Sequence, residues 1–95
     1  MYTDRYNIAD FANMTLRDLA WALNNLEADA ESCKSSLMRT EYHLRTAAAD
    51  SNVSEERRIL LSDQLGERRC EYASVLLQLD AAFAVYSTLR AGRDQ

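Results

Sequence analysis

The amino-acid sequence predicts an all-α protein, an antiparallel hairpin of two long helices that follow a short N-terminal segment. Two rows of mostly apolar residues recur at alternating spacings of three and four, and one polar stretch separates them. This alternation marks the buried seam of paired helices. The chain has no proline and only two glycines, so it lacks the turn-forming residues that β architectures need. We therefore expect a single helical domain over residues 1–95.

Residues 1–14 are predicted to form a separate short element, whose apolar bulk comes from Tyr2, Tyr6, Ile8 and Phe11. Asn7 and Asp10 carry side chains that can cap a short helix. Thr15 and Asp18 then form a variant capping box, with Asp in place of Glu, which opens the first long helix. One continuous helix from Ile8 is the alternative, and the capping box makes us prefer a break.

The first long helix is expected over residues 15–48 and spans about 50 Å at the usual rise per residue. Its heptad row consists of Leu16, Leu19, Leu23, Leu26, Ala30, Cys33, Leu37, Thr40, Leu44 and Ala47. These side chains share one narrow stripe of the helix, as the seam of a coiled coil or a helical bundle requires.

The second long helix is expected over residues 54–91, after the polar stretch 49–54. Ser54 is a good N-cap, and Gly92 can end the helix in the left-handed conformation. Its heptad row consists of Leu61, Leu65, Arg68, Tyr72, Val75, Leu79, Ala82, Tyr86 and Leu89. A turn this short makes the two helices antiparallel neighbours.

The two rows match when the hairpin is folded. Leu26 then lies near Val75 or Leu76, and the small Ala30 lies near the large Tyr72, which is the interdigitation that a core needs. The charged half of the hairpin next to the turn is expected to be looser than the open end.

The second helix is apolar on more than its seam. Residues 73–86 are apolar almost all the way round, with Leu77 and Ala84 opposite the seam. A helix that is apolar on two faces is covered on two faces. The cover is the N-terminal segment, a second copy that completes a four-helix bundle, or a helix of another protein.

The composition favours protein partners over other classes of ligand. The formal net charge is −4, which is unfavourable for general binding of nucleic acid or anionic membranes. No apolar run has the length of a membrane span, and no signal peptide is evident. We expect a cytoplasmic protein, and the preference for Arg over Lys suggests a bacterial or phage source.

The leading functional hypothesis is a non-enzymatic chaperone, adaptor or regulator that binds another protein helix, or itself as a homodimer. The residues expected to contact the partner are Tyr6, Phe11, Trp21, Leu77, Ala84 and Val85. The alternative is a dimeric nucleic-acid-binding regulator that uses arginines of the second helix, Arg57, Arg58, Arg68 and Arg69. Acidic residues surround these arginines, so pairing within the helix is the simpler explanation.

Catalytic and metal-binding patterns are not evident. The single histidine, His43, has no metal-ligating residue three or four positions away, and no glycine-rich loop is present to hold a phosphate. Cys33 falls on the seam and Cys70 on the outward face of the second helix, so their side chains should point apart and stay reduced. We expect no enzyme activity, no cofactor and no metal.

Overall fold

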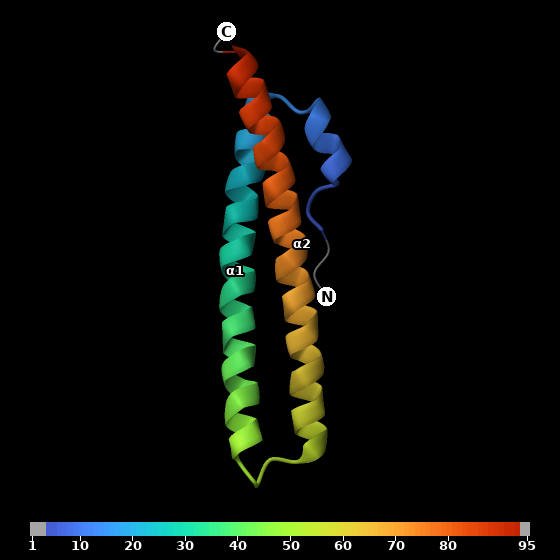
Figure 1. Ribbon diagram of the computed structural model, residues 1–95, viewed down its shortest axis with the longest axis vertical. Helices are drawn as coiled ribbons and strands as arrows, with labels where there is room; N and C mark the ends of the chain where they lie inside the picture. The colour runs from blue at the N-terminus through green and yellow to red at the C-terminus, as the bar shows by residue number, and fades with distance from the viewer. Residues whose placement is uncertain (1–3, 94–95) are drawn as a thin grey trace.

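The computed structural model describes residues 4–93 as a long hairpin, 64 × 19 × 14 Å in its principal extents. The elements are the 3₁₀ helix η1 (Ile8–Asn13) and the α-helices α1 (Leu16–Ala49) and α2 (Glu55–Arg93), with no strand in that range. Figure 1 shows α1 and α2 side by side and antiparallel, with η1 beside the open end of the hairpin. The predicted helical hairpin is confirmed.

Helix α1 begins where its capping residue predicts. Thr15 has an extended backbone, and its side chain accepts a hydrogen bond from the backbone N–H of Asp18 at 3.2 Å. Every residue of the predicted heptad row of α1 is buried or half-buried. The row therefore forms the seam, and the helix ends one residue later than expected.

The turn between the helices is held by side chains. Asp50 accepts a hydrogen bond from the backbone N–H of Asn52, and the Ser54 hydroxyl accepts one from that of Arg57 at the start of α2. The guanidinium of Arg58 donates to the carbonyl oxygens of Ala47 at 3.1 Å and Asp50 at 2.7 Å. Arg58 thus adds a second hydrogen bond to each of two carbonyl oxygens that already accept the backbone N–H groups of Asp50 and Val53.

The far end of α2 differs from the prediction. The helix continues through Gly92 to Arg93, and no glycine within residues 4–93 has a positive φ. Gly92 is therefore not a C-cap in the left-handed conformation. A single glycine inside a helix costs only about 1 kcal/mol relative to alanine, which does not force the helix to stop.

The core is concentrated in the open half of the hairpin. Its cluster of fully buried side chains consists of Phe11, Leu19, Ala22, Leu26, Val75 and Ala82. Of the two neighbours predicted for Leu26, Val75 belongs to this cluster with it, whereas Leu76 is exposed. Toward the turn, the buried apolar residues are only Ala47, Leu61 and Leu65 among those described, and each keeps some exposure.

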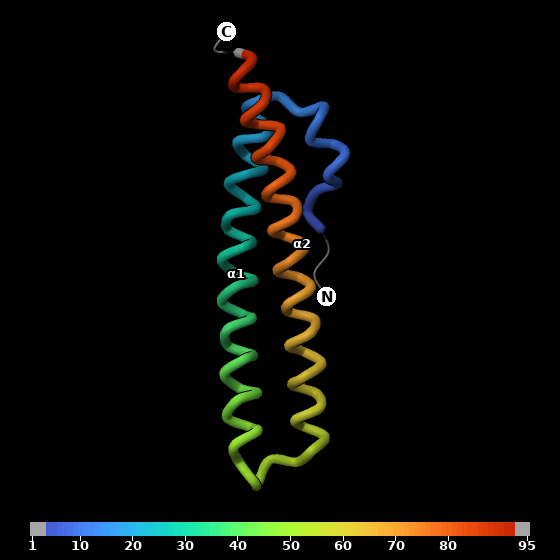
Figure 2. The backbone as a smooth tube through the Cα atoms, viewed as in Figure 1, coloured from blue at the N-terminus to red at the C-terminus, as the bar shows by residue number. Residues whose placement is uncertain are grey.

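The N-terminal segment folds back along the hairpin. Residues 4–13, here called the strap, run beside α2 before the chain turns into α1, as the tube in Figure 2 shows. Asn7 caps η1 by accepting a hydrogen bond from the backbone N–H of Ala9. The predicted break before α1 is present, because Met14 and Thr15 are both extended. Tyr2 lies outside the described residues.

Candidate protein-binding surface

Helix α2 carries a second set of covered residues beside its seam. Ser74, Gln78, Ala81 and Val85 follow one another at spacings of four, three and four, and all are buried or half-buried. The strap lies over them. Of the three covers that the sequence left open, the strap of the same chain therefore occupies this part of α2.

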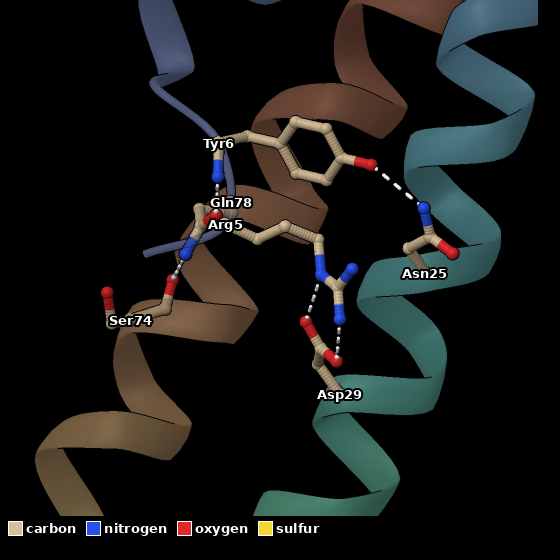
Figure 3. A network of polar contacts seen from close by, with 6 residues as sticks. All are labelled: Arg5, Tyr6, Asn25, Asp29, Ser74 and Gln78. Atoms are coloured by element: carbon tan, nitrogen blue, oxygen red, sulfur yellow. Dashed lines mark hydrogen bonds and ion pairs between the residues drawn. The ribbon is translucent and has the colours of Figure 1, made fainter. Parts of the chain in front are cut away.

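A polar network fixes the strap to α2 (Figure 3). The backbone N–H of Tyr6 donates to Gln78 Oε1 at 3.0 Å, and Gln78 Nε2 donates to the carbonyl oxygen of Ser74 at 3.3 Å. The Ser74 hydroxyl in turn donates to the carboxylate of Asp4. Gln78 is only 1% exposed, so its amide forms hydrogen bonds with these groups in place of water.

The same strap is also tied to α1 (Figure 3). The guanidinium of Arg5 donates to both carboxylate oxygens of Asp29, at 2.8 and 2.9 Å. Asn25 Nδ2 donates to the hydroxyl of Tyr6 at 3.0 Å. The strap therefore bridges α1 and α2 on one side of the hairpin.

Phe11 is the apolar anchor of the strap. Its side chain is 0% exposed and belongs to the core cluster, and the Tyr6 ring lies 5.7 Å from it, centroid to centroid. The sequence assigned both residues to a partner-facing surface. Phe11 is instead buried within its own chain and Tyr6 is half-buried, so neither belongs to the surface described next.

The rest of the outward surface of α2 is uncovered. Leu77 is 62% exposed and Phe83 is 60% exposed. We call this surface the uncovered face of α2, and it consists of Ala73, Leu76, Leu77, Asp80, Phe83 and Ala84, all of them exposed. Large apolar side chains thus gather on one helix face around the single charge of Asp80.

Other predicted contact residues lie around this face rather than on it. Val85 is half-buried and borders a shallow hollow of about 300 Å³ together with Ala12 and Ala84. Trp21 is 61% exposed but lies on α1, where it lines a separate hollow with Arg17 and Ala20. Leu77 and Ala84 are thus together on α2, whereas Trp21 belongs to a different surface.

The four arginines of the alternative hypothesis do not form a free strip. Arg58 binds the carbonyl oxygens at the turn, and Arg68 forms an ion pair with Glu71 at 3.0 Å. Arg69 lies 3.9 Å from Glu41, and Arg57 is exposed. Pairing within the chain thus holds Arg58 and Arg68, whereas the contact of Arg69 is at the outer limit of an ion pair.

The cysteines lie as their heptad positions predict. Cys33 is half-buried on the seam and Cys70 is exposed, and both are free thiols. Burial raises the pKa of the Cys33 thiol, and the carboxylates of Glu71 and Asp29 raise it further. Within residues 4–93, no group of three or more His, Cys, Asp or Glu side chains could hold a metal ion.

By length and composition alone, the stretch of α2 from Glu55 to Gly92 is apolar enough to cross a membrane. Core helices of water-soluble proteins pass the same test when they are mostly buried, whereas only 17% of the apolar window of α2 is buried. Comparison of the chain with protein-family models, with curated proteins and with solved structures finds no match.

Proposed function

We propose that the protein is a non-enzymatic interaction module that binds a helix through the uncovered face of α2. The observation that carries the proposal is the exposure of Leu77 and Phe83 on a helix whose opposite side forms the core. Burying one such side chain against a partner contributes about 1.5–3 kcal/mol. A partner helix with apolar residues at heptad spacing fits this surface, because it buries the same stripe along its own length.

The module binds proteins rather than nucleic acid in this proposal. A phosphate-binding strip needs several arginines that are free to pair with phosphates and so release the counterions of the nucleic acid. Arg58 and Arg68 are held by partners within the chain, and the uncovered face itself carries only the negative charge of Asp80. Charge near the apolar face therefore favours a partner with a basic side chain opposite Asp80.

The test compares tagged wild-type protein with two variants that introduce the same charge at equally exposed positions. Leu77→Glu changes the uncovered face of α2, whereas Tyr42→Glu changes an exposed position on α1. Each tagged protein is co-expressed with an untagged copy of itself and captured with and without nuclease. Native mass spectrometry then gives the mass of the eluted complex. We expect a stoichiometric protein that survives nuclease, is lost with Leu77→Glu and is retained with Tyr42→Glu.

The opposite results would overturn the proposal. A partner that binds Leu77→Glu as well as the wild type does not use this face. Nucleic acid that co-elutes and disappears after nuclease treatment would make the arginines the binding site. Circular dichroism should show unchanged helicity for Leu77→Glu, because this side chain makes little contact with its own chain.

A further inference from the structure

An exposed heptad row runs along α2 through the uncovered face. It consists of Gly66, Arg69, Ala73, Leu76, Asp80 and Phe83, at alternating spacings of three and four, and every member is exposed. Three of its six members, Ala73, Leu76 and Phe83, are apolar, and they lie at the spacing that the seam of a helix pair uses. The sizes and charges of these residues define the helix that fits against the row.

We infer that the occupant is a second copy of this chain, which lays its own α2 antiparallel against the first. This inference rests on the proposed function, because both use the uncovered face of α2. In an antiparallel pair, the register that sets Leu76 opposite Ala73 of the second copy also sets Phe83 opposite Gly66 and Asp80 opposite Arg69. The contacts occur twice, as a two-fold axis requires.

Sizes are complementary in this register. The two largest apolar side chains of the row, Leu76 and Phe83, each meet one of its two smallest residues, Ala73 and Gly66. No atom lies within 4 Å of the position that a Cβ at Gly66 would take, so the surface there is open. A large side chain over a small one lets two helices interdigitate closely.

Charges are complementary in the same register. Asp80 forms no ion pair within residues 4–93, and Arg69 approaches only Glu41, at the long distance of 3.9 Å. Opposed across the pair, Asp80 and Arg69 neutralise each other at two symmetric positions. An unpaired carboxylate buried in an apolar seam would instead oppose association.

Other arrangements lose this match. Sliding the second copy of α2 by one heptad sets Asp80 opposite Leu76 in one direction and opposite Ser62 in the other. In neither position does Arg69 face a carboxylate. A parallel pair sets Asp80 against Asp80, and like charges at a contact are unfavourable. The pairing of opposite charges therefore selects a single antiparallel register.

The test exchanges the two charges. We compare the wild type with Asp80→Arg, Arg69→Asp and the double variant Asp80→Arg/Arg69→Asp by sedimentation and native mass spectrometry. Both positions are exposed, so the variants should keep their helices, as circular dichroism will check. Glu31→Arg, on an exposed position of α1, matches the charge change of Asp80→Arg away from the row.

The wild type and Glu31→Arg are expected to be dimers. Each single variant of the row should raise the dimer Kd by about tenfold or more, because the contact then opposes two like charges twice. An equal mixture of Asp80→Arg and Arg69→Asp should form heterodimers in which both contacts are attractive. The double variant keeps the wild-type net charge and should regain the Kd of the wild type to within about threefold.

Each failure has its own meaning. The wild type could stay monomeric at every soluble concentration and still capture another protein that Leu77→Glu loses. That result would overturn the second copy as the occupant and would leave the proposed function standing. A dimer that the single charge variants do not weaken, or that the exchange does not restore, overturns the inferred pairing. If the only partner is a second copy, and neither Leu77→Glu nor the charge variants weaken the dimer, both proposals are overturned.

Discussion

The side-chain oxygen of Gln78 accepts a hydrogen bond from the backbone N–H of Tyr6 at 3.0 Å, although the residues are 72 positions apart in the chain. The same amide donates to the carbonyl oxygen of Ser74 at 3.3 Å. One buried side chain of α2 thus satisfies the strap and its own helix together. The position of the strap is therefore set by a polar group as well as by apolar packing.

Replacing Gln78 should release the strap. Gln78→Met keeps the length of the side chain but leaves the N–H of Tyr6 without its partner, a loss of about 1–3 kcal/mol in the free energy of unfolding. Chemical denaturation measures this loss, and hydrogen exchange should show a faster amide at Tyr6. Ser87→Ala, an exposed change on the same helix, is the control. Unchanged protection of the Tyr6 amide would contradict the assignment.

Phe11 should contribute most of the apolar stability of the strap. Its side chain is 0% exposed, and Phe11→Ala should lower the free energy of unfolding by about 3 kcal/mol, as for other buried aromatic residues. Ile8→Ala changes an exposed residue of the same 3₁₀ helix and should cost far less. Thermal unfolding compares the two, and equal losses would show that Phe11 is not the anchor.

Two neighbouring arginines should contribute unequally to the stability of the hairpin. Arg58 donates to the carbonyl oxygens of Ala47 and Asp50, so Arg58→Ala should destabilise the turn by about 1–2 kcal/mol. Arg57 is exposed, and Arg57→Ala should change stability by less than about 0.5 kcal/mol. Urea denaturation of both variants measures the difference. A larger loss from Arg57→Ala would place the stabilising guanidinium elsewhere.

The two thiols should react at different rates. Burial and neighbouring carboxylates raise the pKa of Cys33, so less reactive thiolate is present at neutral pH than for an ordinary cysteine. Cys70 is exposed. Alkylation followed by mass spectrometry should label Cys70 first, and labelling of Cys33 should require a higher pH. Equal rates at neutral pH would mean that the seam opens readily around Cys33.

The sequence was sufficient for the hairpin because the seam depends on a local periodicity. Spacings of three and four place apolar side chains on one stripe whatever lies elsewhere, and the capping residue Thr15 marks a boundary from its own chemistry. The strong exposure of Leu77 also follows from its position opposite the seam. These features need no knowledge of what the rest of the chain does.

The strap was harder to predict because its position is a tertiary choice. Heptad spacing shows that α2 has a second apolar side, but it does not say which of several covers lies there. Gln78 was missed because glutamine is usually exposed, and only its place within the apolar stretch 73–86 hinted at burial. Phe11 and Tyr6 were assigned to a partner because no local sequence pattern shows that the strap folds back onto its own hairpin.

Met14 and Thr15 are extended and join the strap directly to α1. The strap can therefore stay on α2 through contacts that would be too weak for a separate peptide. A joint this short holds residues 4–13 near the covered residues of α2 at an effective concentration on the order of millimolar. A detached peptide with the same contacts would need to be supplied at such a concentration to bind equally well. Tethering therefore lets a modest set of contacts keep the strap on α2, and the strength of those contacts can be measured from how well the detached peptide competes with it.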